Sequence, residues 1–190
     1  MFKQLFKYLF AVFFAVSLFS VIVFTAGWLF YYQNTFKPEK ENIMALIHKA
    51  PDDEQNLSTP ARLLLLDVIH KRSCLMSARA LVYNLDIPHP IEGIHGKQVT
   101  IFYWSLFLCQ DLTEQQRLTI IASHWPYLSE RNSYGLNAVA NHLYNLPLSE
   151  LSIEQLANVV ACNRGEFICM QAMRRKTLAD TLLNNYYKNN

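Results

Sequence analysis

The chain has 190 residues, of which 52% are hydrophobic, and a formal net charge of +2. A length in this range favours a single domain, and so small a net charge gives no sign of a nucleic-acid partner. The sequence has no long Gly-, Ser- or Pro-rich tract and no internal repeat, which excludes low-complexity and repeat architectures. Much of the apolar excess lies at the N-terminus.

The N-terminal segment has the composition of a membrane-spanning helix. No charged residue occurs between Lys7 and Lys37, and residues 8–32 read YLFAVFFAVSLFSVIVFTAGWLFYY. About 20 apolar helical residues cross a hydrocarbon core of about 30 Å, so this stretch is long enough to span a bilayer with some tilt. Trp28 and Tyr32 lie near its far end, where such rings favour the interface. We expect residues 8–32 to be a transmembrane helix.

The charges on either side of this segment predict its orientation. Lys3 and Lys7 precede it, whereas the lysines that follow it are accompanied by glutamates. The positive-inside rule then keeps residues 1–7 in the cytoplasm as a short tail and places the rest of the chain on the other side. A cleaved signal peptide is the alternative, but its apolar region is usually shorter and ends in small residues around a cleavage site, a pattern that this sequence lacks.

The four cysteines fit an extracytoplasmic location. An even number of cysteines in an oxidising compartment allows two disulfides. Cys162 and Cys169 enclose a short loop containing Gly165, and a bridge there would leave Cys74 to pair with Cys109. Four cysteines allow three connectivities, and the sequence does not choose among them. Four buried free thiols are the alternative interpretation.

The segment after the span is polar and is interrupted by two prolines. Residues 33–58 are therefore interpreted as a stalk that carries one short helix. Thr59 and Pro60 then fit an N-cap followed by the first residue of a helix. The pattern predicts one continuous helix over residues 61–85. Its buried face is expected to contain Leu63, Leu66, Ile69, Leu75 and Ala78.

Residues 97–110 are apolar almost throughout, so periodicity does not distinguish a strand from a buried helix there. Two S/T-x-x-Q patterns, beginning at Thr113 and Ser152, predict capping boxes that open two helices. Ser133 is expected to open another helix, which ends before Pro147. The last predicted helix covers residues 167–188. Its inward-facing positions are expected to be Ile168, Met173, Leu178 and Leu182.

Residues 133–161 read SYGLNAVANHLYNLPLSELSIEQLANVVA. This stretch resembles the closing third of the peptidoglycan glycosyltransferases (glycosyltransferase family 51), which polymerise a lipid-linked disaccharide precursor into glycan strands. The Y-G, alanine-rich and S-E-L-T segments of the family correspond here to Tyr134–Gly135, Ala138–Ala140 and Ser149–Ser152. A weaker resemblance extends from Thr59 to the end of the chain, with a shortened middle.

The resemblance implies a fold and a location. It implies a mostly α protein in which a single N-terminal transmembrane helix precedes a small lysozyme-like all-α domain, covering residues 59–190. It also implies that this domain faces the periplasm from a bacterial inner membrane. The partners that follow from it are the lipid bilayer, the lipid-linked peptidoglycan precursor or glycan, and another protein of the cell envelope.

The sequence departs from the family at the catalytic positions. The position of the family's general base reads Ile69, and the second glutamate falls on Thr119 or Ile121, depending on the alignment. The glycine-rich segment of the family is reduced to GIHGKQVTIFYW. An isoleucine cannot take the proton of the acceptor hydroxyl, which is what the reaction requires. The resemblance therefore implies a relative that lacks both catalytic glutamates.

A few polar residues near these positions are candidate site residues. His70 and Asp67 are weak candidates for a replacement base, because on a helix each would point away from the position that Ile69 occupies; an ordinary solvated pair is the alternative. The cations that could hold a phosphate or a glycan carboxylate are Lys71, Arg72, Arg79 and Arg164. Solvated charge is the alternative interpretation of these four. No metal site is expected, since the six histidines lack metal-binding spacing.

Three hypotheses about function follow. The first is a non-catalytic pseudoenzyme that binds glycan, lipid-linked precursor or a partner protein and needs no cofactor. The second is a reduced but active peptidoglycan glycosyltransferase, for which a divalent metal would hold the leaving pyrophosphate. The third is a structural subunit of a membrane complex, which the apolar run IFYWSLFL favours, because fold need not imply function.

Overall fold

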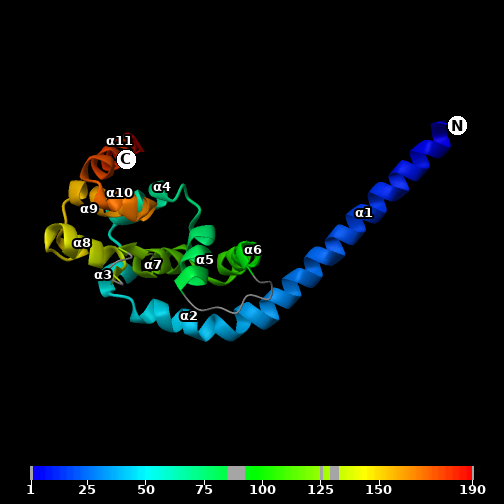
Figure 1. Cartoon of the computed structure of the whole chain (residues 1–190), viewed down its shortest axis with the longest axis horizontal. Coiled ribbons are helices and arrows are strands. Elements are labelled where there is room, and N and C mark those ends of the chain that lie inside the picture. Colours follow the sequence, from blue (N-terminus) through cyan, green and yellow to red (C-terminus); the bar gives the residue numbers. More distant parts are fainter. Residues whose placement is uncertain (1, 85–92, 125, 129–132, 190) are drawn as a thin grey trace.

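The chain folds into one long N-terminal helix and a helical body (Figure 1). The computed structural model describes residues 2–84, 93–124, 126–128 and 133–189. Its α-helices are α1 (Phe2–Tyr31), α2 (Lys37–Lys49), α3 (Asp52–Gln55), α4 (Thr59–Val68), α5 (Ser73–Asn84), α6 (Gly93–Asp111), α7 (Glu114–His124), α8 (Leu136–Tyr144), α9 (Ile153–Ala161), α10 (Glu166–Met170) and α11 (Ala172–Asn189). The short elements are a π turn at Tyr32–Phe36, 3-10 turns at Leu148–Glu150 and Cys162–Arg164, and the antiparallel pair β1 (Pro126–Leu128) and β2 (Ser133–Tyr134). The expected mostly α architecture is confirmed.

The helix α1 is apolar and projects away from the body (Figure 1). It continues through the π turn into α2, so that Lys7–Lys49 form one uninterrupted helix. Among the residues that the structure describes, this is the one helix long and apolar enough to cross a membrane, and its most apolar window is not buried. An exposed apolar helix of this length needs another apolar surface, and a bilayer supplies one.

Two groups of buried side chains form the core of the body. The first, which we call the aromatic cluster, joins the end of α1 and α2 to α5, α6 and α7. It is centred on Phe36, Trp104 and Phe107, each at most 1% exposed. The rings of Phe36 and Trp104 meet edge to face, with centroids 5.4 Å apart, a geometry that aromatic quadrupoles favour.

The second group, which we call the aliphatic cluster, joins α4, α7, α8, α9 and α11. Its members are mainly Leu, Ile, Val and Ala; fully buried examples are Leu65, Leu118, Val139 and Val160. In Figure 1 these helices occupy the part of the body farther from α1, whereas α5 and α6 lie nearer to it. The body is therefore one folded unit with two differently composed halves.

Residues 33–58 do not form the expected stalk. The helix α2 buries Ile43 and Ile47 in the aromatic cluster, and α3 buries Glu54. The prediction was wrong because this segment is polar in sequence. Only one narrow face of α2 is apolar, and that face packs on the body, whereas α3 is held through its buried carboxyl. Lys40 of α2 also forms an ion pair with Asp111 at the end of α6, at 2.8 Å.

Two predicted helix boundaries were also wrong. Ser133 lies in β2 rather than in a helix, and α8 begins only after Gly135, whose φ of +92° an L side chain rarely adopts. The predicted C-terminal helix breaks at Gln171 into α10 and α11. As a result Met173, expected to face inward, is 83% exposed, whereas Leu182 is buried.

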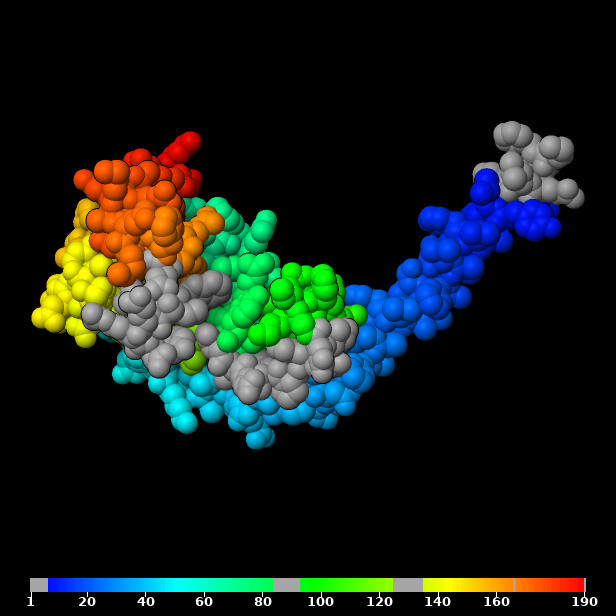
Figure 2. All heavy atoms as spheres, in the orientation of Figure 1, coloured from blue at the N-terminus to red at the C-terminus, as the bar shows by residue number. Residues whose placement is uncertain are grey.

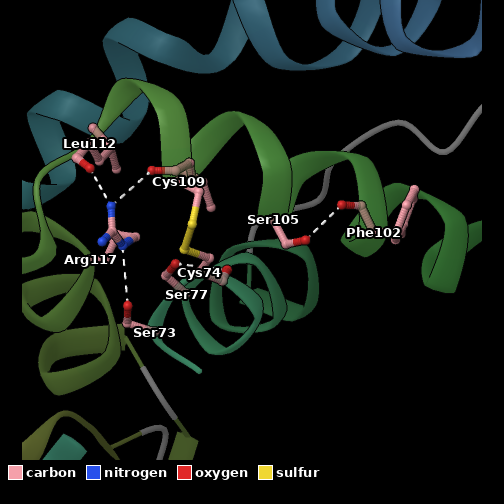
Figure 3. The surroundings of a disulfide bond; sticks show 9 residues. Ser73, Cys74, Ser77, Phe102, Ser105, Cys109, Leu112 and Arg117 are labelled. Carbon is pink, nitrogen blue, oxygen red and sulfur yellow. Dashed lines mark hydrogen bonds between the residues drawn. A yellow bond between two sulfur atoms is a disulfide. The ribbon is translucent and has the colours of Figure 1, made fainter. Parts of the chain in front are cut away.

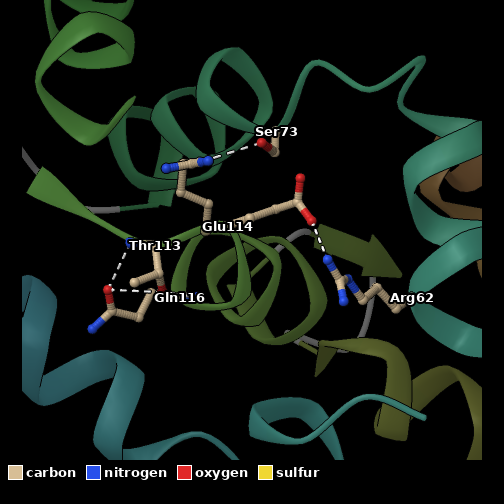
Figure 4. A network of polar contacts seen from close by, with 6 residues as sticks. Arg62, Ser73, Thr113, Glu114 and Gln116 are labelled. Atoms are coloured by element: carbon tan, nitrogen blue, oxygen red, sulfur yellow. Dashed lines mark hydrogen bonds and ion pairs between the residues drawn. The ribbon is translucent and has the colours of Figure 1, made fainter. Parts of the chain in front are cut away.

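Residues 97–110, for which periodicity left strand and buried helix open, are helical within α6. The predicted N-cap at Thr59 is wrong by one residue, because Ser58 caps α4 and accepts from the Ala61 amide. The two predicted capping boxes are confirmed. Figure 4 shows the capping box of α7, in which the Thr113 amide donates to Oε1 of Gln116 at 2.9 Å and the Gln116 amide donates to Oγ1 of Thr113. The capping box at Ser152 opens α9. Both boxes satisfy amides that a helix N-terminus would otherwise leave unpaired.

The structure pairs Cys74 with Cys109 and Cys162 with Cys169. The first bridge joins α5 to α6, and Figure 3 shows Arg117 of α7 beside it. The Arg117 guanidinium donates to the carbonyl oxygen of Leu112 and to Oγ of Ser73. These contacts tie α7 to the start of α5 and the end of α6.

Candidate functional site

The segment between α4 and α5 carries most of the predicted site residues. The expected continuous helix over residues 61–85 is wrong, because His70 and Lys71 adopt left-handed backbone conformations, with φ of 51° and 56°. The Lys71 amide donates to the carbonyl of Leu66 at 2.8 Å and the His70 amide to that of Asp67 at 2.9 Å. These bonds satisfy carbonyls at the end of α4 in the manner of a helix C-cap.

The composition of this turn offers a physical reason for the break. Ile69 is buried, at 3% exposed, whereas His70, Lys71 and Arg72 are exposed. Basic side chains interact favourably with the negative end of a helix dipole, so the two cations Lys71 and Arg72 stabilise the C-terminus of α4. The left-handed backbone costs free energy for non-glycine residues, and the burial of Ile69 with the packing of α5 offsets that cost.

Four of the predicted residues lie close to this turn: Asp67, His70, Lys71 and Arg164. The Arg164 guanidinium contacts Nε2 of His70 at 2.5 Å. Because arginine has only donors, this nitrogen of His70 must be the acceptor. Asn185 of α11 donates to Oδ2 of Asp67 at 2.9 Å. Each candidate base thus already has a hydrogen-bond donor beside it.

A cavity of about 380 Å³ lies between α4 and α11. Its apolar lining comes from Leu63, Leu64, Leu66, Leu182 and Tyr186, and its polar lining from Asp67, Lys71, Asn185 and Asn189. Leu63 and Leu66, expected to be buried, are half-exposed because they line this space. A cavity with an apolar wall and a few polar groups is the usual form of a small-molecule site.

The other two predicted cations lie elsewhere. Arg79 is exposed on α5, and Arg72 is exposed where α5 begins. Neither lines the cavity between α4 and α11. Lys71 is thus the cation that the structure brings to the cavity, and Arg164 is brought to the adjacent turn by the 3-10 turn that the Cys162–Cys169 bridge constrains.

The positions of the two family glutamates are closed to solvent. Ile69 is 3% exposed, Thr119 is 2% exposed and Ile121 is fully buried. The Thr119 hydroxyl donates to the carbonyl of Gln115 within its own helix, at 3.0 Å. None of these three side chains can act as a general base.

Among the residues that the structure describes, Glu54 is the buried carboxyl, and it was not predicted from the sequence. It is 2% exposed, and its carboxylate accepts hydrogen bonds from the amides of Leu136 and Asn137 at the start of α8, the latter at 2.8 Å. Burial raises the pKa of Glu54 to about 7, although these amide bonds lower it. A carboxylate at a helix N-terminus is favoured by the helix dipole.

Gly135 makes this arrangement feasible. A Cβ atom at this position would lie 2.6 Å from Oε1 of Glu54, which is too close for any other residue without rearrangement. The glycine at position 135 was the one sequence signal that another side chain comes close to the backbone at this point. Since Glu54 is closed to solvent, we assign it a structural role in fixing α8 against α3. Among the described residues, no group of three or more His, Cys, Asp or Glu side chains could hold a metal ion.

No family model, no curated protein and no solved structure matches this chain.

Proposed function

We propose that this protein is a membrane-anchored relative of the peptidoglycan glycosyltransferases, with a lysozyme-like domain in the periplasm, that binds the lipid-linked precursor without polymerising it. The proposal rests on the sequence resemblance in residues 133–161 and on one structural observation. That observation is the cavity between α4 and α11, in which an apolar wall adjoins Lys71. A lipid-linked disaccharide combines an apolar chain with an anionic pyrophosphate, and these two surfaces complement such a ligand.

The closed catalytic positions support the non-catalytic part of the proposal. Ile69 and Thr119 offer no general base, which alone is typically worth about 10²–10⁴-fold in rate. His70 and Asp67 already accept hydrogen bonds from Arg164 and Asn185. A transferase that used Nε2 of His70 as its base would first have to break the contact with Arg164.

An uncleaved anchor is part of the same proposal. Tyr31 is 5% exposed and Phe36 is 1% exposed, so the end of the apolar segment belongs to the core of the body. Cleavage near the end of the apolar segment would remove buried side chains and expose the surface they cover. The two disulfides support an extracytoplasmic body, because such bonds persist in oxidising compartments, and Lys3 with Lys7 supports a cytoplasmic N-terminus.

The test uses the purified full chain in detergent and a labelled lipid-linked disaccharide-pentapeptide, with and without divalent metal. We expect saturable binding and no glycan chains. Lys71→Ala should weaken binding, whereas Lys49→Ala, an exposed lysine on α2, should not. Glycan chains that disappear in His70→Ala or Asp67→Ala would instead establish a reduced but active transferase. If the assay shows neither binding nor glycan chains, the remaining hypothesis is a structural subunit of a membrane complex, which co-purification would test.

A further inference from the structure

The joint between α1 and the body is rigid. The helix passes from α1 through the π turn into α2 without a break, and the turn buries Thr35 and Phe36. Nε1 of Trp104 in α6 donates to Oγ1 of Thr35 at 3.0 Å, and Trp104 is fully buried. A buried hydrogen bond surrounded by packed rings leaves the helix no freedom to swivel about this point. The direction of α1 therefore fixes how the body faces the membrane.

The helix α6 packs on the part of α1 that lies within the expected span, residues 8–32. The Tyr103 ring lies against Gly27, where a Cβ atom would collide with the phenol oxygen. Its centroid is 6.0 Å from that of Phe24, and the rings of Trp28 and Phe107 meet edge to face at 4.7 Å. Figure 1 shows α6 beside the end of α1 nearest the body.

This packing sets the depth of α6. At a rise of about 1.5 Å per residue, residues 8–32 are longer than a hydrocarbon core of about 30 Å. With the start of the core at Tyr8, Trp28 lies at its outer boundary and Phe24 about 6 Å inside that boundary. Tyr103 contacts Phe24 and Gly27, which places the middle of α6 at the same boundary. Tyr and Trp rings are enriched at this level of a bilayer.

The surface that α6 leaves uncovered is suited to lipid. Phe102 is 49% exposed and Ile94 is 75% exposed, and Figure 2 shows the surface of α6 open beside the end of α1 nearest the body. A groove of about 310 Å³, lined by Phe19, Ser20, Val23, Phe24 and Tyr103, runs between α1 and α6. At this depth the surrounding medium is acyl chain, and an apolar groove there takes an acyl chain.

We propose that α6 lies in the membrane interface, with Phe102 and the groove between α1 and Tyr103 in contact with lipid acyl chains. The body then touches the bilayer through a second element in addition to its anchor. This inference rests on the transmembrane role of α1 in the proposed function, and it is independent of what the cavity between α4 and α11 binds.

Photocrosslinking in nanodiscs of phosphatidylethanolamine and phosphatidylglycerol tests it. The photoreactive residue p-benzoylphenylalanine replaces Phe102 in the full chain, and two matched variants carry it at Phe14, exposed in the span, and at His48, exposed on α2. Mass spectrometry after irradiation reads out lipid adducts. We expect adducts at residues 14 and 102 and none at residue 48. Formation of the Cys74–Cys109 bridge verifies the fold of each variant.

The other outcomes overturn the inference in distinguishable ways. Adducts at residue 14 without adducts at residue 102 would show that α1 spans the bilayer while α6 stays in water. No adduct at residue 14 would overturn the anchor and the inference with it. Adducts at residue 48 equal to those at residue 102 would show that the body contacts lipid without using α6 specifically.

Discussion

The aromatic cluster and the aliphatic cluster of this small body differ in composition and in the elements that they join. The aromatic cluster buries large rings around Trp104 and receives the end of the apolar helix α1. The aliphatic cluster packs smaller side chains such as Val139 and Val160 around α9. Large rings span the gap between a membrane helix and a helical body with few residues, and their polar tips suit the bilayer interface.

The two clusters also differ in which features of the protein they contain. The stretch that resembles the glycosyltransferases, residues 133–161, contributes to the aliphatic cluster. The cavity and the basic turn at His70 lie at the border of that cluster. The aromatic cluster instead fixes the body on α1. The cavity of the proposed function and the joint with α1 thus lie in different halves, and the predictions below compare the stability of those halves.

The largest effect is expected at Trp104. Replacing it with alanine removes a fully buried ring and leaves the hydroxyl of Thr35 without its donor, which should lower the free energy of unfolding by about 4 kcal/mol. Gln98→Ala, at an exposed site on the same helix, should change it by less than about 0.5 kcal/mol. Denaturant titration of the full chain in micelles, followed by circular dichroism, measures both. Equal effects would contradict the central role of the ring.

The two disulfides allow the clusters to be compared directly. The Cys74–Cys109 bridge, with a sequence separation of 35, should contribute about 4 kcal/mol, and the Cys162–Cys169 bridge, with a separation of 7, about 2 kcal/mol, because a longer closed loop restricts the unfolded chain more. Paired Cys→Ala variants and the same titration test this. The reverse order would mean that the C-terminal turn carrying Arg164 depends more on its bridge than the aromatic cluster does.

The buried Glu54 predicts a pH dependence of stability. Its pKa is about 7 in the folded chain against 4.5 in the unfolded chain, so the folded state binds the proton more tightly. The free energy of unfolding is then greatest below pH 4.5. It falls by about 3 kcal/mol in total as the pH rises toward 7, and it is constant above pH 7. Glu54→Gln should flatten this slope, whereas Asp52→Asn, at an exposed site nearby, should leave it unchanged. A slope retained in Glu54→Gln would assign it to another group.

The smallest effect is expected at the cap of α9 in the aliphatic cluster. Oγ of Ser152 accepts from the amide of Gln155, and Oε1 of Gln155 accepts from that of Ser152. Ser152→Ala should therefore cost about 1 kcal/mol. Thr181→Ala, at an exposed position within α11, serves as the control and should change the unfolding free energy by less than about 0.5 kcal/mol. An unchanged midpoint in Ser152→Ala would show that tertiary packing alone holds α9.

The sequence by itself determined the features whose causes are local. The apolar run of α1 follows from the absence of charge between Lys7 and Lys37. The capping boxes at Thr113 and Ser152 follow from side chains that reach amides three residues away. Patterns of this kind need no distant partner to form, so they can be recognised before the fold is known.

Only the tertiary structure decided the rest. The left-handed turn at His70 and Lys71 exists because Ile69 must be buried while α5 turns back onto α6 and α7. The burial of Glu54 depends on α3 meeting α8 at Gly135. The polar segment 33–58 contributes Phe36, Ile43 and Ile47 to the core, because one face of α2 packs on the aromatic cluster. In each case residues far apart in the chain supply the energy that overrides the local preference.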